Sequence, residues 1–545
     1  MGSSVSNPAD TTTTSESSTS QTSPLISSST TIVDSEGGSI DTLLEYGGIS
    51  RPRQSSIASL ASAEETESAA VLLENPRAKF NLNCVFESES WGQNGVAGIG
   101  DEISNLLKNI VGSGGLSIPG GIAAFANSPS AMWPSVAVIW IMGIANAYSF
   151  SLIGRICAIT KSHSYSMAWD RTVGRRYGSK YQLFVDSVVF GKAILGTWSF
   201  SIIIASTCTP LYRWLLENLP DVFGITSSHD GNNVSQSVSP SGVLVVITLF
   251  LLLPICLSQQ LASLSIFSAI GTLGTLVTIS TMILRFLDGS YTEGGIFYDD
   301  LSVNQRPSFG TDKGASAFLT SFKSLTLVSI LSTGYIAHYN APKYYYELKD
   351  HTTGRFNIVV TFGFLFAAIT YTVVSTMGFL TFGENSMGFV LDNYSYRDPL
   401  ATVARFGVAV SVIFAYPLLF HGGRDGLLAL LKTLSSTTTI DTGSSSSSYT
   451  QTESNIVTVL LLSTVTALAI YVNDLTFVLS FSGATMSSLI IYIFPPFMFS
   501  SLVKNCCCYV SEDTDREVKL GYVMMVSGAM LGVAGAYVAV ERAFF

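Results

Sequence analysis

The strongest constraint on this chain is a series of apolar stretches, each about as long as a lipid bilayer is thick. An α-helix rises about 1.5 Å per residue, so roughly 20 apolar residues cross the hydrocarbon layer. Only a helix satisfies all of its backbone polar groups within one such stretch, so the sequence predicts an all-α membrane protein. We predict eleven transmembrane helices, at residues 103–125, 132–158, 182–208, 243–258, 263–287, 316–338, 357–382, 401–420, 455–472, 475–500 and 520–541.

The composition excludes two other classes of protein. Charged residues make up only 12% of the 545 residues, about half the share found in soluble domains, and this is too few to cover a soluble multidomain enzyme. The net charge of −10 also argues against a nucleic-acid-binding protein, which needs a basic face. The chain has no HExxH motif and no carboxylate pair at membrane depth, so we expect no enzymatic activity.

The first 95 residues differ from the rest of the chain. Ser and Thr supply 29 of the first 68 residues, and residues 1–95 carry 12 acidic against 4 basic side chains. Such a segment buries too little apolar surface to fold, so we predict a disordered cytoplasmic tail over 1–95 and a membrane domain over 96–545. The stretch Arg51-Pro-Arg53-Gln-Ser55-Ser56 suits a basophilic kinase. The tail is therefore either a contact for a cytoplasmic regulatory partner or a solvated linker.

The basic residues of the loops set the predicted orientation. With the amino terminus in the cytoplasm, the cytoplasmic loops hold 13 Lys and Arg and the opposite loops hold 5. The two glycosylation sequons, at Asn233 and Asn393, both fall on the non-cytoplasmic side, as glycosylation requires.

The cysteines have no zinc-ligand spacing, so no metal site is expected. Three of the seven are adjacent and follow the tenth span: Cys506, Cys507 and Cys508. A cytoplasmic run beside the membrane suits S-acylation, and three unmodified thiols are the alternative.

The first span contains residues that a membrane helix avoids. Gly112-Ser113-Gly114-Gly115 is followed by Pro119, and each Gly costs a helix about 1 kcal/mol relative to Ala. Unwound backbone at that depth is tolerated where it lines a cavity. Its free N–H groups attract an anion and its free carbonyls a cation, which matches the two ends of an amino acid. Glycine-mediated helix packing is the alternative reading.

A second irregularity lies five spans later, at Ser332-Thr333-Gly334 in the sixth span. Secondary transporters often contain two inverted repeats with broken helices at matching positions. Spans one and six would be the first members of two five-span repeats, and span eleven an appendage. The predicted substrate-binding backbone and side chains are Val111, Gly112, Ser113, Gly114, Gly115, Ser332, Thr333 and Gly334.

Four motifs resemble the amino acid/auxin permease family of the amino acid–polyamine–organocation superfamily. They are NLLKNIVGSGGLSIP (105–119), AHYNAPKYYYELK (337–349), YPLLFHGGRDGLL (416–428) and LSFSGATMSSLIIYIFPPFMF (479–499). The second resembles sodium-coupled neutral amino acid transporters and plant vacuolar transporters. Two positions depart from the family pattern: Pro342 is displaced by one place, and His421 stands where proline is usual. The resemblance covers about residues 100–540 and implies the leucine-transporter fold of five plus five helices.

The same resemblance bears on the coupling ion. At the position of Lys108, sodium-coupled relatives carry an asparagine that helps to hold sodium, whereas proton-coupled relatives carry lysine. A fixed ammonium group there would repel sodium, so Lys108 and the neighbouring Asn109 favour protons as the coupling ion, with sodium as the alternative. Other candidates are Ser411 and two histidines whose usual pKa suits proton transfer, His338 and His421.

The sequence thus predicts a secondary active transporter of neutral amino acids that works by alternating access, is linked to protons and needs no cofactor. The alternatives are a sodium-coupled symporter and an amino acid sensor on the same scaffold. The expected partners are the substrate and the bilayer, and the expected location is the plasma membrane or a vacuole or lysosome.

Overall fold

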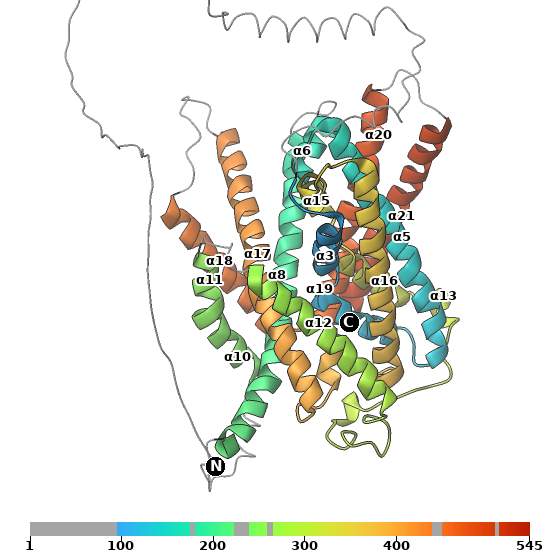
Figure 1. Ribbon diagram of the computed structural model, residues 1–545, viewed down its shortest axis with the longest axis vertical. Helices are drawn as coiled ribbons and strands as arrows, with labels where there is room; N and C mark the ends of the chain where they lie inside the picture. The colour runs from blue at the N-terminus through green and yellow to red at the C-terminus, as the bar shows by residue number, and fades with distance from the viewer. Residues whose placement is uncertain (1–94, 175–179, 223–238, 259–264, 439–449, 507–511) are drawn as a thin grey trace, which may run out of the picture. The chain divides into compact units, whose positions relative to one another are not determined.

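The computed structural model describes residues 95–174, 180–222, 239–258, 265–438, 450–506 and 512–545 (Figure 1). The predicted tail 1–95 lies almost wholly outside these residues. The described part is helical, with two isolated β-bridges and no strand. The regular helices are α3 (Ile99–Ile110), α4 (Ile118–Ala123), α5 (Met132–Thr160), α6 (Tyr165–Trp169), α8 (Lys180–Val222), α10 (Pro240–Ile247), α11 (Leu253–Leu257), α12 (Ser265–Leu287), α13 (Ala317–Thr320), α14 (Ser324–Gly334), α15 (Ala341–Glu347), α16 (Thr353–Phe382), α17 (Pro399–Thr438), α18 (Gln451–Tyr471), α19 (Leu475–Ser482), α20 (Phe494–Cys506) and α21 (Glu512–Phe544).

Shorter 3₁₀ and π turns connect or interrupt these helices. The 3₁₀ segments are η1 (Ser113–Ser117), η2 (Pro129–Ala131), η6 (Val303–Gln305), η7 (His338–Asn340) and η8 (Val390–Asn393). The π segments are η3 (Asp170–Gly174), η4 (Thr248–Leu252), η9 (Gly483–Ser487) and η10 (Leu489–Ile493).

Eight helical stretches of the described residues are long and apolar enough to cross a membrane, rather than the eleven that we predicted. They are Pro129–Thr160, Tyr181–Asn218, Pro240–Leu257, Thr353–Phe382, Pro399–Leu431, Gln451–Tyr471, Leu475–Lys504 and Glu512–Phe544. The first and sixth predicted spans differ because each is divided into shorter helices. The fifth corresponds to α12, whose long apolar part covers Leu273–Leu287.

Two helices extend beyond the predicted spans. We predicted that the third span ends before Pro210, but α8 continues through this proline to Val222. A proline removes one backbone hydrogen bond without necessarily ending a helix. Likewise, α17 continues to Thr438 through a segment that we assigned to a loop.

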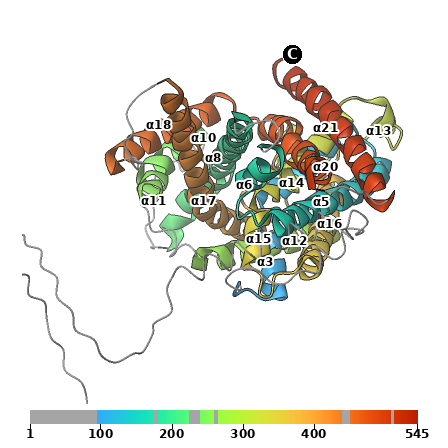
Figure 2. The same ribbon diagram turned by 90° about the horizontal axis from the view of Figure 1, so that it is seen from above.

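The helices pack in two neighbouring groups that share contacts. In one group α16 packs against α5 and α3, and in the other α17 packs against α8 and α12 (Figures 1 and 2). The crossing of α12 and α17 is close because Gly274 and Gly407 face each other; a Cβ added at Gly407 would lie 2.5 Å from the Cα of Gly274. Small residues at a crossing are typical of helix packing in membranes.

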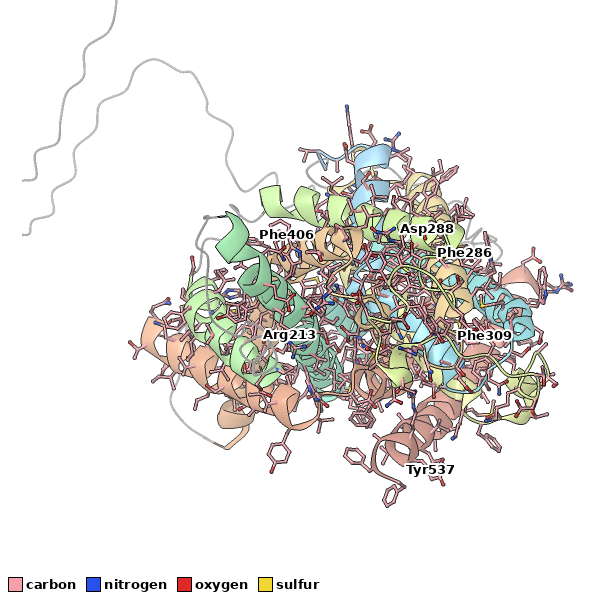
Figure 3. All side chains as sticks on the ribbon, turned by 90° about the horizontal axis from the view of Figure 1, so that it is seen from below. Arg213, Phe286, Asp288, Phe309, Phe406 and Tyr537 are labelled. Atoms are coloured by element: carbon pink, nitrogen blue, oxygen red, sulfur yellow. The ribbon has the colours of Figure 1, made fainter. Side chains whose placement is uncertain are left out.

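The appended helix α21 also packs through glycine. Gly528 and Gly535 are seven residues apart and therefore lie on one face of the helix. A Cβ at Gly528 would lie 2.5 Å from the Cβ of Tyr492 in η10, and one at Gly535 would lie 2.7 Å from the hydroxyl of Ser329 in α14. The other face of α21 carries exposed apolar side chains such as Tyr537, which is 68% exposed and points away from the bundle in Figure 3.

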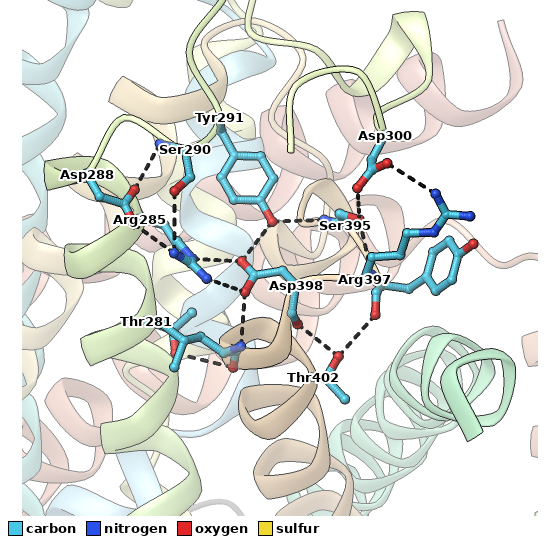
Figure 4. A network of polar contacts seen from close by, with 12 residues as sticks. Thr281, Arg285, Asp288, Ser290, Tyr291, Asp300, Ser395, Arg397, Asp398 and Thr402 are labelled. Carbon is cyan, nitrogen blue, oxygen red and sulfur yellow. Dashed lines mark hydrogen bonds and ion pairs between the residues drawn. The ribbon is translucent and has the colours of Figure 1, made fainter. Parts of the chain in front are cut away.

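A polar network joins the end of α12 to the start of α17 (Figure 4). Arg285 donates from Nε to Oδ2 of Asp398 at 2.9 Å and from Nη2 to Oδ1 at 2.7 Å. The Tyr291 hydroxyl donates to the same carboxylate at 3.0 Å. Burial and the nearby Asp398 charge raise the pKa of Tyr291 well above its usual range, so this phenol remains a donor. Asp398 also accepts from the backbone N–H of Leu400 and thus caps α17.

Removal of this carboxylate should destabilise the fold. Asp398 is fully buried, and Asp398→Ala leaves Arg285 and Tyr291 without their shared acceptor. Breaking a buried pair in this way costs about 3 kcal/mol. We expect a lower thermal unfolding temperature for the detergent-purified variant. Asp299→Ala, which removes a 94% exposed carboxylate paired with Arg306, is the control and should change stability by less than about 0.5 kcal/mol. Equal effects of both substitutions would contradict the prediction.

Candidate functional site

The first predicted span breaks where its glycines occur. α3 ends at Ile110, and Val111 and Gly112 are non-helical, with ψ values of 76° and −170°. The 3₁₀ turn η1 then begins at Ser113 and leads into α4. The prediction that the backbone is unwound in this span is therefore confirmed; this concerns its local structure and not its role in binding.

The sixth predicted span breaks in the matching way. α14 ends at Gly334, the backbone of residues 335–337 is non-helical, and the chain continues through η7 into α15. Each broken span thus has a helix whose carboxyl end stops within the bundle, at Ile110 in α3 and at Gly334 in α14. Carbonyl groups at a helix end carry a partial negative charge and need a donor or a cation.

One side chain meets both ends. The hydroxyl of Tyr371, on the unbroken helix α16, lies 2.8 Å from the carbonyl oxygen of Ile110 and 2.9 Å from that of Gly334, and it can donate to either. Tyr371 is fully buried, and its ring packs edge-on against Tyr335 with 66° between the ring planes. We did not select Tyr371 from the sequence, because a tyrosine within an apolar span gives no signal of its own.

The glycines of the first break have different surroundings. A Cβ added at Gly112 or Gly114 would meet no atom within 4 Å, whereas a Cβ at Gly115 would lie 2.6 Å from Cε1 of Tyr371. Gly115 therefore allows α16 to approach, and Gly112 and Gly114 border open space. The side chain of Ser113 is not among the described ones.

The sixth-span candidates contact the tenth predicted span. Thr333 donates from Oγ1 to the carbonyl of Leu479 in α19 at 2.8 Å. The Ser332 hydroxyl lies 3.3 Å from that of Tyr492 in η10, and the Asn146 amide of α5 donates to Tyr492 at 3.1 Å. The two π segments here, η9 and η10, were not predicted; such segments leave carbonyls free and often occur at functional sites.

The close contact of this span with α14 depends on Gly483, which begins η9. A Cβ at this position would lie 1.7 Å from the carbonyl oxygen of Ser329, so only glycine fits. Backbone of the sixth and tenth predicted spans is therefore in direct contact next to the break at Gly334.

Three of the ion-coupling candidates lie near the two breaks. Lys108 is in the last turn of α3 and is exposed, and Asn109 follows it with a buried Nδ2 that lacks a hydrogen-bond partner within the described chain. His338 is fully buried in η7, where Nε2 lies 3.1 Å from the carbonyl oxygen of Asn146. Its Nδ1 has no partner in the described part of the protein.

The other two ion-coupling candidates lie on α17, and no described contact links them to the breaks. The Ser411 hydroxyl faces α12, 2.6 Å from where a Cβ of Gly271 would stand. His421 is buried beside Phe420, and its Nε2 has no partner within the described residues. The sequence grouped these residues with Lys108, but the structure does not bring them together.

The modification candidates are mostly outside the described residues. Asn233, Cys507 and Cys508 are not described, and of Cys506 only the backbone at the end of α20 is. Asn393, the other glycosylation candidate, lies within the described residues. Its side chain is fully buried, Nδ2 donates to the carbonyl of Asn385 at 2.8 Å, and Oδ1 accepts from the N–H of Met387. The nitrogen that would carry the sugar is therefore inside the folded protein.

Taken with the apolar helices, the two broken spans characterise a multi-pass membrane protein. The chain belongs to the transmembrane amino acid transporter protein family, which it matches over residues 95–540. The resemblance drawn from the four motifs is thereby confirmed, and the family consists of transport proteins rather than enzymes.

Individual relatives are distant. The chain is 22% identical over 454 residues to "Putative sodium-coupled neutral amino acid transporter 11" of Danio rerio, covering 83% of this chain and 88% of the relative. It is 23% identical over 251 residues to "Vacuolar amino acid transporter 5" of Schizosaccharomyces pombe, covering 46% of this chain and 54% of the relative. Among solved structures, the crystal structure of MhsT in complex with L-phenylalanine aligns with a TM-score of 0.47 and 11% identity, covering 83% of this chain and 99% of that one.

Proposed function

We propose that this protein is a secondary active transporter of neutral amino acids that works by alternating access and is driven by protons rather than sodium. The family supports amino acid transport, and the name of the Danio rerio relative supports a neutral substrate. The substrate would lie against the interrupted backbone of residues 111–115 and the carboxyl end of α14 at residues 332–334.

The observation that carries this proposal is the meeting of the two helix ends at Tyr371. The same hydroxyl is within hydrogen-bond distance of the last carbonyl of α3 and of α14. Beside these ends, the backbone at Gly112 and Gly114 borders open space. Backbone carbonyls would bind the ammonium group of an amino acid, and the N–H groups of η1 would bind its carboxylate.

Two features favour protons over sodium. The exposed ammonium group of Lys108 lies one turn before the break in α3 and repels other cations. The Tyr371 hydroxyl donates its one hydrogen to either of the two carbonyl ends, so one carbonyl that could bind sodium is already occupied. The relative named as sodium-coupled makes sodium the competing choice.

The test is uptake of a labelled mixture of neutral amino acids into proteoliposomes that contain the full chain. One set has an inward proton gradient and the other an inward sodium gradient at equal pH. We expect at least tenfold accumulation over protein-free liposomes with protons alone. Accumulation that requires a sodium gradient would show that sodium, and not the proton, is the coupling ion. Binding without flux under either gradient would indicate a sensor and would refute the proposed transport.

A further inference from the structure

A buried carboxyl group near the amino end of α3 lies outside the site described above. Glu102 is in the first turns of α3 and is fully shielded from solvent. Neither Oε1 nor Oε2 has a hydrogen-bond partner in the described chain. An ionised carboxylate buried in this way is costly unless it is paired, so the group takes up a proton instead.

The charged groups around Glu102 compensate a negative charge only in part, because Lys343 favours the ionised form whereas Glu347 and Asp101 oppose it. α15 contributes Lys343 and Glu347, whose Nζ and Oε1 are 3.7 Å apart, so the ammonium group is paired and is also 68% exposed. On α3 itself, Asp101 adds a second negative charge and accepts from the backbone N–H at the start of the helix. Glu347 and Asp101 both disfavour an ionised Glu102.

The remaining ionisable neighbours do not pair with this carboxyl group either. The Tyr344 hydroxyl of α15 donates to the backbone carbonyl of Asn105 at 3.3 Å. At the start of α16, Arg355 donates from Nε to the carbonyl of Lys349 at 3.1 Å. Burial, followed by the charge of Glu347, therefore raises the pKa of Glu102 to about 7, which favours the protonated carboxyl group over the ionised one more than in a solvated glutamate.

Glu102 lies where α3, the first helix of the first broken span, is close to α15, the helix that follows the break in the sixth. Residues 95–97 run beside the end of α15, where the N–H of Ala97 donates to the carbonyl of Glu347 at 3.0 Å and Lys349 donates back to Ala97 at 2.8 Å. α3 and α15 are adjacent in both ribbon views (Figures 1 and 2). A movement of α3 away from α15 would admit water to Glu102, and a hydrated carboxyl group ionises.

Polar groups also lead from Glu102 towards the break. Residues 102, 105 and 109 are three and four apart, so they share one face of α3. Asn109 has a buried Nδ2 without a partner in the described chain, and it is about 10 Å along the helix from Glu102. Three residues further on, Gly112 is exposed at the break. This face therefore places polar groups between the buried carboxyl group and the proposed substrate site.

We propose that Glu102 is the proton-binding group of the transport cycle. Its carboxyl group holds a proton while α3 packs against α15 and gives that proton to water when this contact opens, leaving a carboxylate that is reprotonated before the contact closes again. The proposal rests on the proposed function, which it deepens by naming the residue that carries the coupling ion.

The test compares two transport modes of Glu102→Gln in proteoliposomes. The amide resembles the protonated carboxyl group in shape and charge but cannot release a proton. We expect accumulation under an inward proton gradient to fall at least tenfold. Counterflow, the exchange of labelled for unlabelled amino acid at equal pH, should stay within about twofold of the wild type. Glu293→Gln, which removes an exposed carboxylate from the loop after α12, is the control and should retain both modes.

The outcomes separate this proposal from the proposed function. Normal proton-driven accumulation by Glu102→Gln would overturn the role of Glu102 and leave the proposed function intact. A wild-type protein whose uptake does not respond to the proton gradient would refute both the role of Glu102 and the proposed function.

If the variant loses both transport modes, thermal unfolding between about pH 5 and pH 8 shows whether Glu102 is protonated in the folded protein. A carboxyl group protonated only in the folded state makes the wild type lose stability as pH rises. The wild type should lose more than Glu102→Gln, and equal losses would overturn the proposal.

Discussion

Gly114→Val is expected to reduce amino acid uptake at least 100-fold without lowering the thermal unfolding temperature. An added Cβ at Gly114 meets no atom within 4 Å, and the backbone of this glycine is not in the left-handed region, so a side chain can start here without backbone strain. Its methyl groups would fill the open space in which the proposed substrate lies. The measurement is uptake together with unfolding of the purified variant.

Two further variants define what this result would mean. Gly115→Val places a Cβ 2.6 Å from Cε1 of Tyr371 and should lower both uptake and unfolding temperature. Gly422→Val adds the same side chain to an exposed, open position on α17 and should leave uptake within about twofold of the wild type. Normal uptake by Gly114→Val would mean that the glycines of the first span serve helix packing alone, the alternative that the sequence left open.

The breaks in the helices could be predicted because they depend on local chemistry. Gly112 to Gly115 disfavour a helix whatever surrounds them, and α3 ends at Ile110, just before this run. Pro119 lies in the first turn of α4, where proline is favourable. The sixth-span break was predicted at Ser332 to Gly334, but these residues complete α14 and the break follows at residues 335–337. The eleven predicted spans include these two divided ones, and the eight long apolar helices of the described residues leave that count unconfirmed. A hydropathy profile gives the length of an apolar stretch, but it cannot show that the stretch is divided into shorter helices.

The side chains that contact the broken helix ends could not be predicted, because these contacts join distant parts of the chain. Tyr371 follows Gly334 by 37 residues and Ile110 by 261, and its acceptors are backbone carbonyls that have no sequence signature. Glu102 stands just before the first apolar span, where a carboxylate is normally solvated. Only the packing of residues 95–97 and α15 around it shows that it is buried.

Tyr371→Phe is expected to reduce uptake about 30-fold. The substitution keeps the ring that packs against Tyr335 and removes the hydroxyl that serves the carbonyl ends of both broken helices. A buried carbonyl left without a donor costs about 1–3 kcal/mol, and 1.4 kcal/mol corresponds to a factor of ten. Because the two ends meet at one hydroxyl, its loss affects both halves of the proposed substrate site together.

The neighbouring Tyr335 provides a matched control for this prediction. Its hydroxyl is also buried, but it donates at 3.0 Å to the carbonyl of Ile139, which lies within the continuous helix α5 and already accepts a bond there. Tyr335→Phe therefore leaves no helix end unsatisfied and should reduce uptake by less than about threefold. Equal losses in the two variants would show that the bundle needs buried hydroxyl groups in general. A large loss confined to Tyr371→Phe would show that transport depends on holding the ends of α3 and α14 at one point, from which both halves of the site are positioned.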